Sequence, residues 1–148
     1  MKTLGELVRG RPVFVISPEA TVLEAAQLMA EKGIGALPVI DQDRLVGIFS
    51  ERDLMTRVVA KNLQPDKVKV KEVMTTQLVT AEENESYESC LMKMRQASIR
   101  HLPVISGGRF LGVISLRDLM AHDIELKDYE IQQLNHFIHY VPPEVTVE

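Results

Sequence analysis

One segment of this sequence occurs twice, and this repeat constrains the fold more than any other feature. Residues 33–55 read GIGALPVIDQDRLVGIFSERDLM and residues 98–120 read SIRHLPVISGGRFLGVISLRDLM, so the two segments agree at 12 of 23 positions with a constant shift of 65 residues and no gap. Such a repeat predicts two similar structural units. A core needs only apolar repetition, yet polar residues recur as well, namely Arg44 with Arg109, Ser50 with Ser115, Arg52 with Arg117 and Asp53 with Asp118. These polar positions indicate a role beyond packing.

The same order of secondary structure is predicted for both copies. Each copy begins with a short helix, at 3–8 and 70–74, which is followed by an extended segment at 13–16 and 78–81. An amphipathic helix comes next, because apolar residues recur at i, i+3, i+4 and i+7. Its inward face carries Val22, Ala25, Ala26 and Met29 in the first copy and Tyr87, Cys90, Leu91 and Met94 in the second.

Sequence motifs also mark the start of that helix and the elements that follow it in each copy. Thr21 and Glu24 match a capping box. After the helix, two strands flank a tight turn, and a last helix opens at Ser50 and at Ser115. The predicted fold class is therefore α/β (α+β), with two β-α-β-β-α repeats.

The length of the chain fits one domain made of two halves. Each half holds about 60 residues, a size that buries its core only marginally when alone, so the halves are expected to share one core. We assign residues 1–59 to the first repeat, 60–69 to a polar linker, 70–122 to the second repeat and 123–148 to a C-terminal tail. A helical stripe predicts a helix over 123–140, which Pro142-Pro143 would stop.

The composition disfavours several classes of protein. The net charge is −4 and there is no run of basic residues, which argues against a nucleic-acid binder. A local basic patch leaves that alternative open; it comprises Arg9, Arg11, Lys67, Lys69 and Lys71. The single cysteine, Cys90, forms no intrachain disulfide, and no apolar run approaches the about 18 residues of a membrane span. We therefore expect a soluble, cytoplasmic protein that does not bind a membrane.

With these motifs in view, residues 3–122 resemble a tandem pair of CBS domains, often called a Bateman module. The motifs are the Leu-Pro-Val-Ile strand, the Gly-[Ile/Val]-x-Ser turn and the Ser-x-Arg-Asp-Leu start of the last helix, each present twice. The resemblance implies two units that pack by their sheets with pseudo-two-fold symmetry. It also implies adenine-nucleotide binding in two clefts between the units, a regulatory role and a homodimer.

The repeated aspartates are candidates for ribose binding. A carboxylate can accept hydrogen bonds from both hydroxyls of a 2′,3′-diol, and the resemblance implies this role for Asp53 and Asp118. An aspartate three residues after a serine N-cap is also explained as a helix start, since it favours the helix dipole.

The phosphate side is predicted from the same helix starts and from one break in the repeat. Free N–H groups at a helix start suit an anion, and an arginine can bind phosphate oxygens with two hydrogen bonds. Arg100 and His101 replace Gly35 and Ala36 of the first copy. The resemblance implies that the residues just before this strand lie near the ligand phosphates, so the pair is interpreted as an asymmetric phosphate clamp, with solvated surface residues as the alternative. The predicted phosphate-binding residues are Ser50, Arg52, Arg100, His101, Ser115 and Arg117.

By family resemblance, the adenine slot is apolar and has a wall from each repeat. Each of its residues alone is equally well explained as core, so they are predicted only as a set. The set comprises Val15, Ile16, Ile34, Gly35, Ala36, Pro38, Thr80, Ala81, Ile99 and Pro103.

These residues together predict a regulatory module, not an enzyme. The expected ligand is AMP, ADP, ATP or NAD(H), and binding would bias the conformation or assembly of the chain, which would signal to a regulated protein that the sequence does not identify. The sequence carries no phosphate loop and no catalytic set, and the His136-x-x-His139 pair is not interpreted as a metal site. The alternative is a ligand-independent dimeric scaffold.

Overall fold

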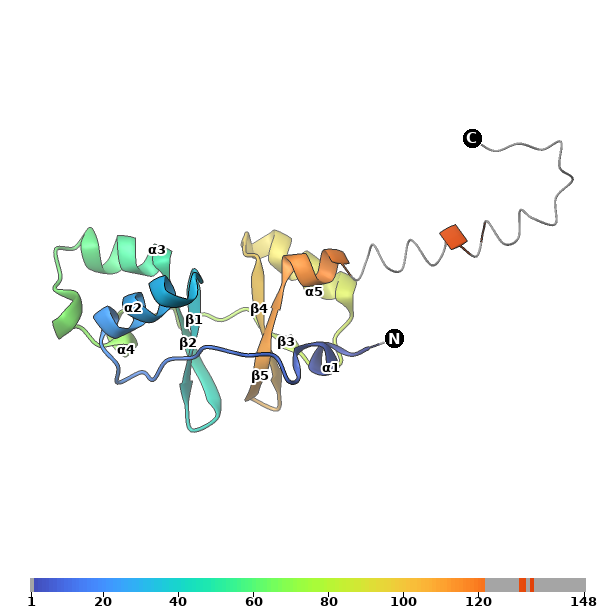
Figure 1. Cartoon of the computed structure of the whole chain (residues 1–148), viewed down its shortest axis with the longest axis horizontal. Helices are drawn as coiled ribbons and strands as arrows, with labels where there is room; N and C mark the ends of the chain where they lie inside the picture. Colours follow the sequence, from blue (N-terminus) through green and yellow to red (C-terminus); the bar gives the residue numbers. More distant parts are fainter. Residues whose placement is uncertain (1, 122–130, 133, 135–148) are drawn as a thin grey trace, which may run out of the picture.

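The structure is a computed structural model that describes residues 2–121, 131–132 and 134. Its fold is mixed α+β and contains a five-stranded sheet (Figure 1). The first repeat comprises helix α1 (Leu4–Val8), helix α2 (Val22–Lys32), strands β1 (Ala36–Asp41) and β2 (Arg44–Ser50), helix α3 (Glu51–Asp53) and the π-helix η1 (Leu54–Val59). The 3₁₀-helix η2 (Pro65–Lys67) follows in the predicted linker. The second repeat comprises α4 (Val70–Val73), β3 (Ala81–Glu82), α5 (Tyr87–Ala97), β4 (His101–Ser106) and β5 (Arg109–Ser115), and residues 116–121 are helical.

The central helix of the first repeat begins at the predicted signal and ends at a glycine. Thr21 Oγ1 accepts a hydrogen bond from the Glu24 N–H at 3.1 Å, which confirms the threonine half of the predicted capping box. Gly33 ends α2 with a φ of 65°, a left-handed conformation that glycine adopts without strain. The predicted inward faces are confirmed, since they supply the helices' buried residues Val22, Ala25, Met29, Cys90 and Met94.

The predicted extended segments form shorter strands than expected. Ile16 makes a single parallel bridge to β1, through its N–H to the Pro38 carbonyl and its carbonyl to the Ile40 N–H, both at 3.0 Å. Pro38 and Pro18 have no N–H with which to continue this pairing toward residue 14 and at residue 18, respectively. In the second repeat, β3 has only two residues and pairs in parallel with β4.

The two hairpins join at their turns to make one sheet of order β1-β2-β5-β4-β3. The turns lie at the same end of the molecule (Figure 1), and both have positive φ at their two central residues, Gln42 and Asp43 in one and Gly107 and Gly108 in the other. Such turns match the natural twist of a hairpin. The hairpins pair with each other at Arg44 and Arg109, and the Phe110 N–H donates to the Asp43 carbonyl at 3.1 Å.

The expectation of one shared core is wrong, because the buried residues form two clusters. One cluster lies in the first repeat and also includes Val70 and Val73 of α4. The other lies in the second repeat and also includes Leu4 and Val8 of α1. Each repeat therefore completes its core with the first helix of the other repeat, which solves the burial problem of a small unit without merging the cores.

A repeated glycine permits this exchange of helices. A Cβ at Gly112 of β5 would lie 2.8 Å from the Val8 Cβ, closer than side chains pack. Gly47, the equivalent residue of β2, faces Met74 next to α4, and a Cβ there would lie 2.9 Å from the Met74 Cγ. The Gly-[Ile/Val]-x-Ser motif thus includes the position where the opposite repeat's first helix approaches the sheet.

Most of the predicted tail helix lies outside the described residues. Of the range 123–140, the structure describes Ile131, Gln132 and Leu134, which are helical. The His136-x-x-His139 pair and Pro142-Pro143 also lie outside the described residues. None of the described helices has the length and apolar character needed to cross a membrane.

Candidate functional site

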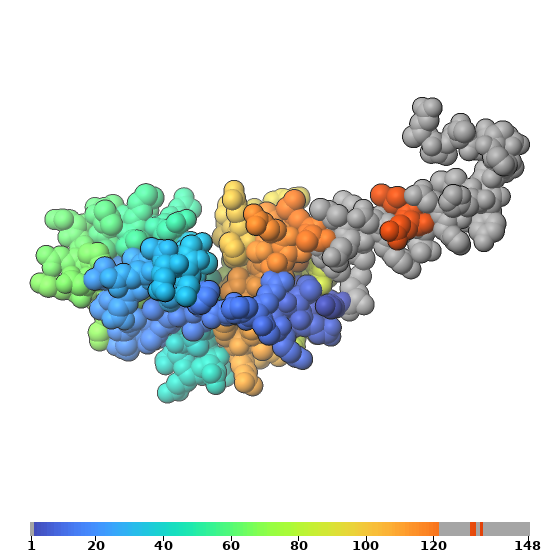
Figure 2. All heavy atoms as spheres, viewed as in Figure 1, coloured from blue at the N-terminus to red at the C-terminus, as the bar shows by residue number. Residues whose placement is uncertain are grey.

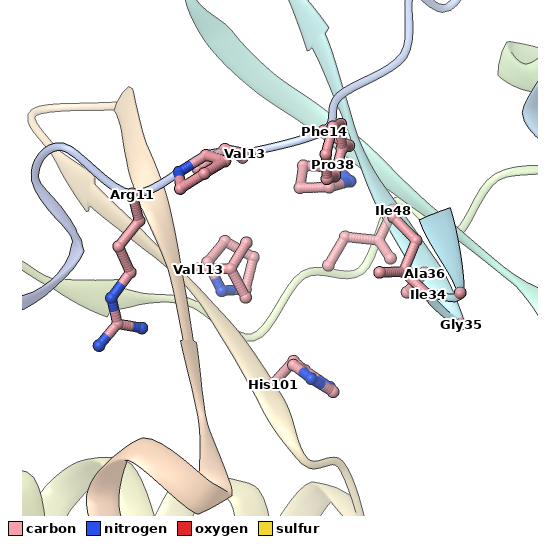
Figure 3. Close-up of a pocket in the computed structure, with 13 residues that line it drawn as sticks. Arg11, Val13, Phe14, Ile34, Gly35, Ala36, Pro38, Ile48, His101 and Val113 are labelled. Atoms are coloured by element: carbon pink, nitrogen blue, oxygen red, sulfur yellow. The ribbon is translucent and has the colours of Figure 1, made fainter. Parts of the chain in front are cut away.

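A pocket of about 370 Å³ lies between the two hairpins (Figure 3). Its walls include three pairs of residues that occupy equivalent positions in the two repeats, each pair separated by the constant shift of 65. These pairs are Ala36 with His101, Pro38 with Pro103 and Ile48 with Val113. The pocket therefore lies on the pseudo-two-fold axis, where a single ligand would touch both repeats.

The two repeats contribute unequally to this pocket. The first repeat adds residues 11–14 and 33–35, whereas the second adds only its members of the three pairs. Of the thirteen described residues that line the pocket, Arg11 and His101 are the ones with ionisable side chains, and the rest are glycine, proline, alanine, valine, isoleucine and phenylalanine. The pocket is thus apolar except at Arg11 and His101. Such a lining suits a ligand that combines a flat apolar group with an anionic group.

The pocket gathers half of the predicted adenine set. The five residues that line it are Ile34, Gly35, Ala36, Pro38 and Pro103. The other five lie elsewhere. Ala81 is wholly buried in the second core and Ile99 packs against that core, while Val15 is 40% exposed. Ile16 pairs with β1 as described above, and the Thr80 carbonyl accepts a hydrogen bond from Lys93 Nζ at 2.7 Å.

Asp53 lies in a closed hydrogen-bond network. Its Oδ2 accepts from the Ser50 N–H and the Ser50 hydroxyl, both at 3.0 Å, and its own N–H donates to Ser50 Oγ at 3.1 Å. Its Oδ1 accepts from the hydroxyl of Thr75, a residue of the second repeat, at 3.0 Å. Arg57 lies 3.6 Å from the same oxygen and donates to the carbonyls of Val73 and Met74. This network caps α3 and ties it to the end of α4.

Asp118 occupies the equivalent position but has a different partner. Its Oδ2 accepts from the Ser115 N–H and from Arg11 Nη1, both at 2.8 Å. Burial would raise the pKa of Asp118, but the hydrogen bonds from Arg11 and Ser115 outweigh it, so that the pKa is lowered. The Asp118 side chain is 25% exposed and that of Asp53 only 9%. Asp118 is therefore the more accessible of the two predicted ribose acceptors.

The predicted helix-start anion sites are largely satisfied by the protein itself. Ser50 and Ser115 accept from the N–H groups of Asp53 and Asp118. The N–H of Glu51 donates to the Gly35 carbonyl at 2.9 Å, and the N–H of Leu116 donates to the Arg100 carbonyl at 2.7 Å. Arg52, Arg100 and Arg117 are exposed and do not line the pocket, whereas His101 does.

Sequence reasoning did not single out Arg11 as a site residue. The segment at 11–14 lines the pocket, and the guanidinium of Arg11 extends from it toward the start of the helix at 116–121 (Figure 3). One signal was available, because the equivalent residue of the second copy is the uncharged Thr76.

The basic patch that left nucleic-acid binding as an alternative is partly neutralised by carboxylates. Lys69 and Lys71 each bind Glu19 at 2.8 Å, and their hydrogen bonds lower the pKa of Glu19 to about 2. Arg11 is paired with Asp118. Three of the five cations in the patch are therefore engaged by carboxylates, which further weakens a nucleic-acid interpretation.

The sequence and fold are similar to those of known proteins. A model of the CBS domain matches residues 4–60 and 70–125. The CBS domain-containing protein YhcV of Bacillus subtilis is 36% identical over 112 residues, which are 76% of this chain and 79% of that protein. Two further curated relatives are longer, and the chain covers 61% and 38% of their lengths.

Solved structures have the same fold as this chain, and two of those structures contain a bound adenosine compound. A CBS-domain protein from Burkholderia ambifaria is 35% identical with a TM-score of 0.73, over 84% of this chain and 95% of that one. The CBS domain protein PAE2072 from Pyrobaculum aerophilum, complexed with AMP, is 29% identical with a TM-score of 0.68, over 78% and 88%. The CBS domain pair of MJ0100, in complex with 5′-methylthioadenosine and S-adenosylmethionine, is 25% identical with a TM-score of 0.69, over 86% and 98%.

Proposed function

Since this chain belongs to the CBS-domain family and carries two copies of the domain, we propose that it is a regulatory module that binds an adenine nucleotide in the pocket between its repeats. The observation that carries the proposal is the apolar pocket on the pseudo-two-fold axis, with Arg11 and His101 as its ionisable residues. Apolar walls suit a purine base, and the cation of Arg11 suits a phosphate.

The ligand class follows from the pocket and from the neighbours. AMP, methylthioadenosine and S-adenosylmethionine share an adenosyl group, which supports an adenosine-type ligand for this chain as well. A volume of about 370 Å³ is at the lower end of the about 300–1,000 Å³ range of small-molecule sites. This favours a mononucleotide such as AMP, ADP or ATP over the dinucleotide NAD(H).

Binding would act on the arrangement of the two repeats. The segment that lines the pocket at 11–14 connects α1, which packs in the second core, with α2, which packs in the first. Figure 2 shows this N-terminal segment lying across both repeats. A ligand shifts a conformational equilibrium only through a difference in affinity between two states. Contact with both hairpins and with the connecting segment supplies that difference, since a change in their separation changes the ligand's contacts.

A thermal-shift panel tests this function. The ligands are AMP, ADP, ATP, NAD⁺, NADH and S-adenosylmethionine, with GMP as the control for base specificity. A ligand at 100 times its dissociation constant stabilises the chain by about 2.7 kcal/mol, an easily measured shift in Tm. Ala36→Phe fills the pocket and is expected to abolish the shift, whereas Ala97→Phe, at the exposed end of α5, is expected to keep it. No shift with any adenine ligand, or an equal shift for both variants, would overturn the proposal.

A dimer is a second element of the proposal, and exposed apolar side chains favour it. Met55 and Met120 occupy equivalent positions and are 59% and 53% exposed, and Val59 and Met92 are also exposed. They lie on α3–η1, on the helix at 116–121 and on α5, at the end of the molecule away from the hairpin turns (Figure 1). A Met55→Asp/Met120→Asp variant is expected to convert a dimer into a monomer in light scattering. A dimeric chain that binds none of the panel ligands would support the scaffold alternative instead.

A further inference from the structure

Arg11 belongs to the pocket through its segment but is held outside it by an ion pair. Its Nη1 donates to Asp118 Oδ2 at 2.8 Å, a contact that joins residues 107 positions apart. Asp53, the equivalent of Asp118 in the first repeat, has no arginine as its hydrogen-bond donor in this contact. It accepts from the neutral hydroxyl of Thr75 instead. The pair therefore distinguishes one end of the pocket from the other.

We propose that Arg11 is the residue by which the pocket selects an anionic ligand, and that the ligand's phosphate and the Asp118 carboxylate compete for its guanidinium. This inference rests on the function proposed above. In the free protein Arg11 is bound to Asp118. When a nucleotide binds, the guanidinium turns to the phosphate and releases the carboxylate.

The geometry permits this exchange. The Arg11 side chain is 39% exposed, so it can change rotamer while its charge stays solvated. After the exchange, Asp118 keeps the hydrogen bonds to Ser115 that cap the last helix, because those bonds do not involve Arg11. Exposed ion pairs contribute only about 0–1 kcal/mol, so a phosphate can compete for the guanidinium at little cost.

The other cations are less suited to this role. Arg52, Arg100 and Arg117 do not line the pocket. His101 lines it, but an imidazole is not a permanent cation, whereas an arginine is always charged. Arg11 is thus the permanent cation whose segment forms a wall of the pocket.

The exchange has a consequence beyond selectivity. The ion pair links the segment at 11–14 to the start of the helix at 116–121, and this helix leads to the C-terminal tail. A phosphorylated ligand would break this link, whereas a ligand without an anion would leave it in place.

The test compares AMP with adenosine by isothermal titration calorimetry on the full chain. The variant Arg11→Met keeps the length and apolar stem of the side chain but removes its charge. Loss of a hydrogen bond to a charged group predicts AMP binding that is weaker by about 10- to 100-fold. Adenosine binding is expected to stay unchanged or to tighten, because Asp118 no longer has Arg11 as a partner. Arg11→Lys is expected to give an intermediate loss for AMP.

Arg9→Met is the matched control, since Arg9 is exposed, lies two residues away and does not line the pocket. It removes the same charge and is expected to leave both affinities nearly unchanged. An equal change for AMP and adenosine in Arg11→Met, or an equal loss in Arg9→Met, would overturn the role of Arg11. If the wild-type chain bound neither compound, the proposed function itself would fail, and this outcome is distinct from the first two.

Discussion

Thr75 of the second repeat donates its hydroxyl to the Oδ1 of Asp53 in the first repeat, at 3.0 Å. Asp53 is thereby both a helix cap and a joint between the repeats. The equivalent Asp118 also forms a helix start with Ser115, but its contact with the other repeat is the ion pair with Arg11. Two identical motifs thus have different surroundings, and their substitution should have different effects.

Asp53→Ala is expected to destabilise the chain by about 2–4 kcal/mol. The variant removes a cap worth about 1 kcal/mol and leaves the partly buried Thr75 hydroxyl without its acceptor, at a cost of about 1–3 kcal/mol. Asp118→Ala is expected to cost about 1–2 kcal/mol, because the ion pair that it loses is exposed. Urea unfolding monitored by circular dichroism measures both values. A larger loss for Asp118→Ala would contradict this assignment.

Gly112→Ala is expected to destabilise the chain by about 1–3 kcal/mol, the usual range for overpacking. The new Cβ would meet the Val8 Cβ at 2.8 Å and displace α1 from the second core. The double variant Gly112→Ala/Val8→Gly, in which residue 8 no longer has a Cβ, tests the contact directly by chemical denaturation. If the glycine matters through this contact, the two losses are less than additive. Strictly additive losses would show that Gly112 acts in another way.

The pH dependence of stability should reveal the link that Glu19 makes to Lys69 and Lys71. The pKa of Glu19 in the folded chain is about 2, against an ordinary value of 4.5, because the two lysines donate hydrogen bonds to it. A lowered pKa stabilises the folded state above the ordinary value, and this contribution is lost as the pH falls from about 4.5 to about 2.

Melting curves of the wild type and Glu19→Gln across this range measure the effect. The Tm difference between them is expected to be small, since the group is exposed, to shrink toward pH 2 and to shrink also in high salt. A difference that persists unchanged at pH 2 would assign the effect to packing rather than charge.

The repeat predicted the hairpins and central helices because it preserves local signals. Thr21, Gly33 and the turn residues act on their immediate neighbours, so their effect can be read from the sequence. The exchange of α1 and α4 between cores could not be read in this way. Leu4 and Val8 suit either core by hydrophobicity, and only the shapes at Gly47 and Gly112 decide which one they enter.

The candidate site was predicted only in part for a similar reason. Pro38, Pro103 and His101 were found because they lie in or beside the repeated motif. Arg11 was missed because its partner Asp118 is 107 residues away, and such an ion pair depends on the packing of the two repeats.

The bound nucleotide is expected to leave the pocket unchanged. Among the described lining residues, none has a carboxylate, thiol or hydroxyl that could act as a nucleophile, so the imidazole of His101 has no such group beside it to activate. Incubation of the purified chain with ATP, followed by chromatography, measures this directly. Steady formation of ADP or AMP by the wild type, lost in Ala36→Phe, would assign a catalytic role to the pocket.

The most direct test of the central claim is a crystal structure of the chain with saturating AMP. We expect AMP between the hairpins, with the base against Ile34 and Ala36 and the phosphate within hydrogen-bond distance of Arg11. Electron density for AMP at a site that does not involve both Pro38 and Pro103, or an empty pocket at saturating AMP, would overturn the proposed binding site.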